Sequence, residues 1–135
     1  MCIRDRVAPD VSLLTKADSA FSFVVQKTNP PFAQAVLYRA RVNDLKEPSR
    51  ETSQGLARPF YEQYIQIVTT KGVTDQDKKT LAEAYAYLGS YYQFTSKDPA
   101  KATENFTKAR EFDPTNRQAQ AFFAAPKKPA AGRGK

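Results

Sequence analysis

The chain has 135 residues, which fits one domain, and 41% of them are hydrophobic, which is enough for a buried core. It contains no His and one Cys, which excludes a His-based catalytic triad, a His-ligated metal, a Cys-based zinc site and a disulfide within the chain. The formal net charge of +7 lies mainly at the ends, because the last ten residues hold four Lys and Arg and no acid. The nearly neutral middle of the chain argues against a nucleic-acid-binding domain.

The two ends of the sequence differ from the rest. The first six residues, MCIRDR, fit no pattern downstream and resemble a translated adaptor or assembly artefact. We therefore expect residues 1–6 to be a non-native leader and the chain to be the C-terminal part of a longer protein. Pro9 and Asp10 break the one short apolar run near the N-terminus, so there is no secretory signal core. Residues 126–135 read as a basic, disordered tail, and the localisation stays open.

The first predicted helix covers about residues 11–28. Asp10 is suited to cap it, and Ala17 and Phe21 fall on one face of the helix. The pair Pro30-Pro31 then stops the helix, because the residue before a proline is driven out of the α conformation. This segment reads as the second helix of a helix pair whose first member is missing.

A helix pair is predicted over about residues 32–70. Its first helix runs from Phe32 to Leu45, and the polar loop 46–54 that follows is expected to be exposed. The second helix must begin near Leu56 or Ala57, because Pro59 is tolerated only in a first turn.

The best-defined helix pair is predicted over about residues 78–113. Gly89 interrupts its first helix at a cost of roughly 1 kcal/mol relative to Ala, which indicates a close approach by another backbone. Asp98 is placed to cap the second helix, with Pro99 at the first helical position. The apolar faces of the two helices are formed by Leu81, Tyr85, Leu88 and Tyr92, and by Ala102, Phe106, Ala109 and Phe112.

A short helix over about residues 116–124 is expected to cover the open end of this pair. The folded part of the chain would then span residues 7–125. Asp75 and Asp77 lie in the loop before the helix that begins at Lys78, and we expect them to cap that helix and not to bind a metal, since no further oxygen ligands stand at a defined spacing.

The segment from Tyr85 to Pro114 resembles the tetratricopeptide repeat, whose pattern is an aromatic residue, then x2-Leu-Gly-x2-Tyr, then Ala-x3-Phe and Pro. Tyr85 replaces the usual Trp, and the turn carries about one extra residue. The resemblance implies an all-α fold, a right-handed α-solenoid of antiparallel helix pairs. It assigns the packing between helices to Ala17, Phe21, Ala40, Ala57, Tyr61, Tyr85, Leu88, Gly89, Tyr92, Ala102, Phe106, Ala109 and Pro114.

The same resemblance implies a partner-binding groove on the concave face, lined by the first helix of each pair. A clamp for a partner's C-terminal carboxylate is not expected, because Arg41 is the one basic residue in the set. The implied groove residues are Gln34, Leu37, Tyr38, Arg41, Glu83, Ala86, Tyr87, Ser90 and Gln93.

We therefore expect a protein–protein interaction scaffold that binds a protein or peptide, with no catalysis, cofactor, metal or small-molecule substrate. A membrane span is not expected, since no run approaches ~20 apolar residues. Two alternatives stay open. One is binding of nucleic acid or an anionic surface through the basic tail, which is less favoured, and the other is an accessory domain of a larger sensor or envelope-assembly protein.

Overall fold

The computed structural model describes residues 10–27, 32–47, 49 and 52–124, and this part of the chain contains helices and no strands. The prediction of an all-α fold is therefore confirmed for the described residues. A 3₁₀ turn, η2 (Asp75–Asp77), precedes the fourth α-helix, and a π-helical turn, η3 (Tyr91–Thr95), follows it. The α-helices are α1 (Val11–Lys27), α2 (Ala33–Leu45), α3 (Arg58–Lys71), α4 (Lys78–Ser90), α5 (Pro99–Phe112) and α6 (Arg117–Ala124).

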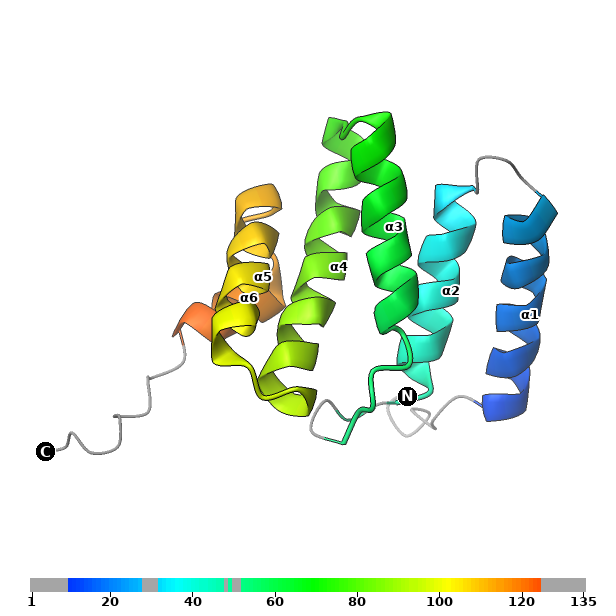
Figure 1. Ribbon diagram of the computed structural model, residues 1–135, viewed down its shortest axis with the longest axis horizontal. Coiled ribbons are helices and arrows are strands. Elements are labelled where there is room, and N and C mark those ends of the chain that lie inside the picture. The colour runs from blue at the N-terminus through cyan, green and yellow to red at the C-terminus, as the bar shows by residue number, and fades with distance from the viewer. Residues whose placement is uncertain (1–9, 28–31, 48, 50–51, 125–135) are drawn as a thin grey trace, which may run out of the picture.

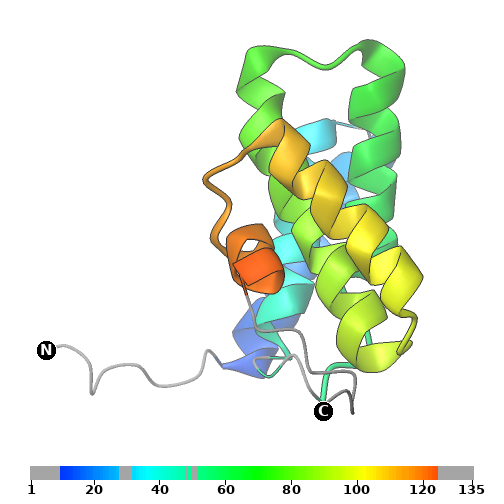
Figure 2. The same ribbon diagram turned by 90° about the vertical axis from the view of Figure 1, so that its left-hand side faces the viewer.

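The helices are stacked in chain order. Figure 1 shows α1, α2, α3 and α4 side by side in a row, and each of them packs against the next along the chain. Figure 2, turned by 90°, shows α5 lying obliquely across α4, with α6 at the side of α5. Each helix thus makes its main contacts with its sequence neighbours.

Several sequence expectations lie outside the described residues. These are the leader at 1–6, the Pro30-Pro31 stop and the tail at 126–135. Residues 48, 50 and 51 of the expected loop are outside them as well.

The core has two parts, and α4 contributes to both. One cluster lies among α2, α3 and α4 and includes Val36, Tyr61 and Leu88. The other lies among α4, α5 and α6 and includes Ala86 and Phe106. Leu81 and Leu88 of α4 belong to the first cluster and Ala82 and Ala86 to the second, so α4 is buried along most of its length and links the two parts of the core.

The neighbour of Gly89 differs from the expected one. The group that approaches the glycine is the aromatic ring of Phe106 in α5, and not another backbone. The missing side chain at Gly89 therefore leaves room for a ring between α4 and α5.

The end of α4 also departs from the sequence prediction. The apolar pattern continues to Tyr92 as if in one helix, but the regular α-helix ends at Ser90 and the π-helical turn η3 follows. Its i→i+5 geometry is visible in the bond from the Ser96 amide to the Tyr91 carbonyl (3.0 Å), and Lys97 then adopts a φ of 57°. A π-turn takes up one more residue than an α-turn, so the chain turns here over Tyr91–Thr95.

The helix caps predicted at Asp10 and Asp98 are present. The cap predicted for α4 is not, because the Asp77 carboxylate makes no cap bond to α4 and accepts from Thr74 instead. The Asp98 carboxylate accepts a hydrogen bond from the Lys101 amide (3.2 Å), and Pro99 occupies the first position of α5. Asp10 accepts a bond from the Ser12 amide (2.9 Å) at the start of α1. These side chains satisfy amide donors that have no partner within the helix.

The expected exposed loop before α3 is tied to the fold. The Glu47 carboxylate accepts hydrogen bonds from the amides of Gln54 (2.7 Å) and Leu56 (3.0 Å), and the Thr95 hydroxyl donates to the carbonyl of Ser53 (2.8 Å). Burial acts to raise the pKa of Glu47, but the hydrogen bonds from these amides outweigh burial. The pKa of Glu47 is therefore lowered from its ordinary value. The described part of the loop is therefore fixed against η3.

The residues assigned to packing between repeats have different environments. Those that are buried are Ala40, Ala57, Tyr61, Leu88, Gly89, Ala102, Phe106 and Ala109. Ala17, Phe21, Tyr85 and Tyr92 are half-buried, and Pro114 is exposed.

Candidate partner-binding surface

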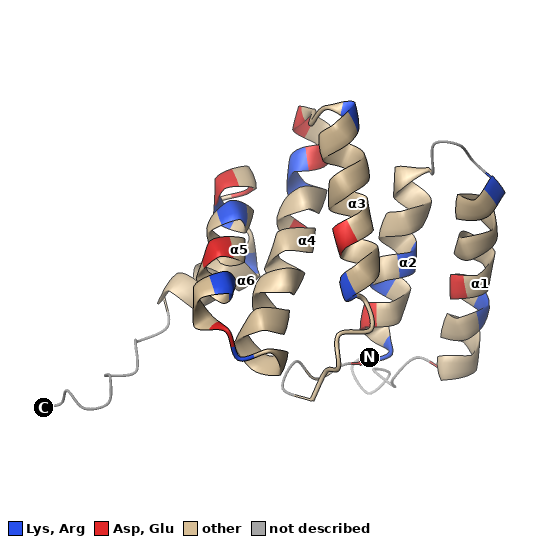
Figure 3. Cartoon of the chain, viewed as in Figure 1, with Lys and Arg blue, Asp and Glu red and all other residues tan. Residues whose placement is uncertain are grey.

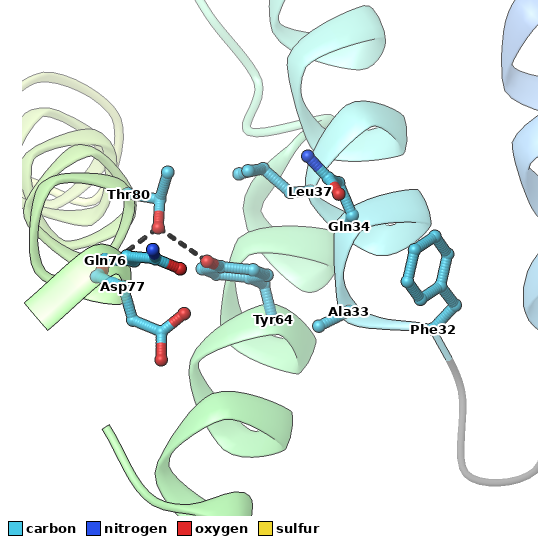
Figure 4. Close-up of a pocket in the computed structure, with 8 residues that line it drawn as sticks. All are labelled: Phe32, Ala33, Gln34, Leu37, Tyr64, Gln76, Asp77 and Thr80. Carbon is cyan, nitrogen blue, oxygen red and sulfur yellow. Dashed lines mark hydrogen bonds between the residues drawn. The ribbon is translucent and has the colours of Figure 1, made fainter. Parts of the chain in front are cut away.

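A hollow of about 320 Å³ lies where the first turns of α2 and α4 meet the side of α3. Figure 4 shows Tyr64 of α3 at its centre, between the side chains of α2 and those of η2 and α4. Helices two apart in the chain thus share a concave site. The lining residues are Phe32, Ala33, Gln34, Leu37, Tyr64, Gln76, Asp77 and Thr80.

A chain of hydroxyl groups crosses the hollow. The Thr80 hydroxyl donates to the carbonyl of Asp77 (3.0 Å) and lies 2.6 Å from the Tyr64 hydroxyl. Since the one proton of Thr80 is used in the bond to Asp77, the Tyr64 hydroxyl donates to Thr80. Burial raises the pKa of Tyr64, so its hydroxyl keeps this proton at neutral pH.

Asp77 is the charged residue of the lining, and its charge is balanced. One carboxylate oxygen accepts bonds from the Lys71 ammonium, the Thr74 amide and the Thr74 hydroxyl, each at 2.9 Å. The Lys71 bond, followed by that of the Thr74 amide, lowers the pKa of Asp77. Together with the Gln34 and Gln76 amides, this makes the hollow polar but almost uncharged.

An ion pair bridges α2 and α4 one turn further along the two helices. The Arg41 guanidinium donates to both oxygens of Glu83 (2.6 and 2.9 Å), and the Tyr61 hydroxyl donates to Glu83 from α3 (2.8 Å). The Glu83 bond raises the pKa of Arg41, whereas burial, followed by the Glu83 charge, raises that of Tyr61. The bidentate geometry fixes the spacing between the two helices.

The structure brings some of the predicted groove residues together at this hollow. Gln34 and Leu37 line it, and the Gln34 amide donates to the hydroxyl of exposed Tyr38 (3.3 Å). Arg41 and Glu83 form the bridge beside it, whereas Gln93 is exposed on η3 and does not line the hollow.

The second half of α4 is not an open groove. Ala86, Tyr87 and Ser90 are buried, and the Tyr87 ring packs at 4.9 Å from the ring of Tyr61. Ala86 belongs to the cluster shared with α5 and α6. The sequence expectation that these three residues line a partner surface is therefore corrected, because neighbours within the chain already cover them.

Several residues that line the hollow are not predicted from the sequence to do so. The sequence predicts Phe32 only as the start of a helix and Asp77 only as a cap, and it assigns Tyr64, Gln76 and Thr80 to no partner surface. Thr80 stands three residues before Glu83 and so shares its helical face, which is a signal that would have found it.

A second hollow of about 300 Å³ lies between α1 and α2, beside Asp18 and Arg39. Arg39 donates to Asp18 (2.6 Å), and its guanidinium lies 4.3 Å from the centre of the Phe60 ring. Asp18 also accepts a bond from the Asn43 amide (3.1 Å). These groups are engaged with one another and hold α1 on α2.

Acidic and basic residues are interleaved along the helices (Figure 3). Within the described ranges, no group of three or more His, Cys, Asp and Glu is placed to hold a metal ion. None of the helices in the same ranges combines the length and the apolar character required to cross a membrane. Comparison with protein-family models, with curated proteins and with solved structures gives no match to this chain.

Proposed function

We propose that this protein is a non-catalytic protein–protein interaction module of the tetratricopeptide-like α-solenoid type. It binds an extended segment of a protein partner across the faces of α2 and α4. The observation that carries the proposal is the hollow between these helices, which are two apart in the chain and held in register by the Arg41–Glu83 bridge.

Stacking between sequence neighbours supports the architecture. In a solenoid each hairpin buries its apolar face on the next one, and the first helices of successive hairpins line one side. Here α3 lies against both α2 and α4, and α5 against α4, while the hollow opens between α2 and α4.

The chemistry of the hollow defines the type of segment it accepts. It offers the amides of Gln34 and Gln76 and the hydroxyl chain of Tyr64 and Thr80, and Phe32 adds an apolar edge that is 53% exposed. Amide groups pair with peptide backbone or with uncharged polar side chains. Arg41 is held by Glu83, so a free carboxylate terminus has no unengaged cation to bind at this bridge.

The proposal is tested with peptides selected from a random library displayed against the whole chain. Gln34→Lys and Thr80→Lys place charge and bulk in the hollow, and each should weaken a selected peptide at least tenfold, equivalent to about 1.4 kcal/mol. Gln93→Lys is the matched control, because it adds the same group on η3 and should leave binding unchanged. Selected peptides that bind all three variants equally would contradict the proposal.

A further inference from the structure

The outer side of α1 carries an exposed apolar surface. Leu13 is 60% exposed, Phe23 59% and Val24 37%, which is unusual for large apolar side chains within one helix. Figure 1 shows α1 at the end of the row, with α2 as its main neighbour.

Phe23 also lines the hollow beside Arg39 of α2, but Leu13 and Val24 are distinct from the side of α1 that packs on α2. Leu14 is buried, and the ring of Phe21 lies 5.4 Å from that of Tyr38 in α2. Asp18 faces Arg39 at 2.6 Å. Leu14, Phe21 and Asp18 therefore attach α1 to α2, and the exposed apolar side chains of α1 are not needed for this contact.

The exposed side has the spacing of a helix-pairing seam. Intervals of three and four residues alternate along it, as at the a and d positions of a heptad repeat. Small residues occupy its centre, which lets two helix backbones approach closely. The seam consists of half-buried Ala17 and the exposed residues Asp10, Leu13, Ala20, Val24 and Lys27.

The seam is complementary to itself when reversed. If a second copy lies antiparallel with Ala17 opposite Ala20 of the other chain, then Leu13 meets Val24. At the ends Asp10 meets Lys27, and both of these residues are exposed. The two-fold symmetry repeats each contact, so an acid faces a base at both ends of the pair.

The flank of the seam fits the same register. Lys16 of one copy falls beside Phe23 of the other, where a cation over an aromatic ring is favourable. Within one chain the Lys27 ammonium already lies 5.3 Å from the centre of the Phe23 ring, so this ring is accessible to a cation.

We infer that α1 is a self-association surface and that its occupant is α1 of a second copy of this chain, packed antiparallel. The inference does not depend on the proposed partner site, which lies on α2, α3 and α4. A single pair of helices forms a small interface, so the dimer is weak and depends on protein concentration.

Sedimentation equilibrium of the whole chain over a range of concentrations tests the association. Leu13→Ser should shift the chain to monomer, whereas Leu56→Ser, which removes an exposed leucine elsewhere, should leave the dimer intact. Circular dichroism checks that both variants remain folded. A wild-type chain that is monomeric at every concentration would overturn the inference.

Charge exchange tests the register. Asp10→Lys and Lys27→Asp each place like charges at both ends of the pair and should weaken the dimer roughly tenfold. The double variant restores opposite charges and should return the dissociation constant to within about threefold of the wild-type value. Asp10→Lys also removes the bond that caps α1, so circular dichroism is used to check that the double variant is folded. A folded double variant that does not recover the dimer would contradict the register.

Disulfide trapping gives a second measure of the register. In a Cys2→Ser background, chains with Ala17→Cys are mixed with chains with Ala20→Cys and oxidised. The mixed disulfide should form faster than either same-site disulfide. Equal rates for all pairs would overturn the antiparallel arrangement.

Discussion

Gly89 of α4 lies directly against the ring of Phe106 in α5, and there is no space between them for a side-chain carbon. A Cβ atom added to Gly89 would stand 2.6 Å from Cδ2 of the ring. The ring is 2% exposed and stacks on Phe122 at 4.4 Å, so it has no free direction in which to move. This contact sets the distance between α4 and α5.

A double-mutant cycle that removes the ring at Phe106 and adds a side chain at Gly89 tests this contact. Phe106→Ala should lower the free energy of unfolding by about 3–5 kcal/mol, because it leaves a cavity. Gly89→Leu should also be destabilising, since the added side chain meets the ring. In the double variant the leucine occupies the space of the ring, so the loss should be smaller than the sum of the single losses by about 1–3 kcal/mol in urea denaturation. Additive losses would show that the two positions are independent.

Gly55 and Gly72 both have a positive φ, but only Gly55 has a neighbouring side chain close by, so comparing them distinguishes a steric clash from backbone strain. Gly55 has a φ of 81°, and its added Cβ would lie 2.6 Å from the Tyr91 ring, whereas Gly72 has a φ of 104° with nothing within 4 Å. Both Gly→Ala substitutions strain the backbone, at about 1–2 kcal/mol. Gly55→Ala should cost more in thermal unfolding, because it also displaces the loop from η3. Equal losses for the two variants would be inconsistent with the loop packing described here.

The helical fold followed from the periodicity of the sequence, and the exceptions have physical causes. Asp98 and Pro99 identified the start of α5 because capping is a local interaction. The π-turn at Tyr91–Thr95 was not predicted, because its apolar pattern continues that of α4. The pairing of Arg39 with Asp18 was not predicted either, because it is a contact between helices that the pattern of one helix does not contain.

Acid should destabilise the fold partly through Asp77. Its pKa lies below the ordinary 3.8 because of Lys71 and Thr74. A carboxyl group whose pKa is lower in the folded state stabilises the fold at any pH above its pKa in the unfolded state. This stabilisation is lost as the pH falls from about 4 through the pKa of the folded state. Asp77→Asn should therefore show a shallower loss of stability below pH 4 in urea titrations.

The link from α3 to the bridge between α2 and α4 is tested at Tyr61. Tyr61→Phe removes the hydroxyl that donates to Glu83 but keeps the buried ring. The free energy of unfolding should fall by about 0.5–1.5 kcal/mol, the usual contribution of one hydrogen bond. Tyr38→Phe is the matched control, since this hydroxyl lies at the surface, and it should leave stability unchanged. An equal effect at both tyrosines would argue against a specific role for the Glu83 bond.

The candidate site was less predictable than the fold. The family resemblance implied Gln34, Leu37 and Arg41, and in the structure Gln34 and Leu37 line the hollow with Arg41 beside it. Ala86 and Tyr87 were misassigned, because the aromatic and small residues of α4 are buried on two sides and the periodicity of one helix does not reveal a second neighbour. Asp77 became part of the site only through the relative positions of α3 and α4.

The side-chain amides of Gln34 and Gln76 offer the most direct test of the binding surface, because each gives its own pair of NMR signals. The ¹⁵N-labelled chain is titrated with a library-selected peptide. The account predicts saturable shifts of these amide signals and of the Thr80 backbone amide, with the α5 and α6 signals unchanged. Shifts confined to α1, α5 or α6 would contradict the assignment of the partner site to α2 and α4.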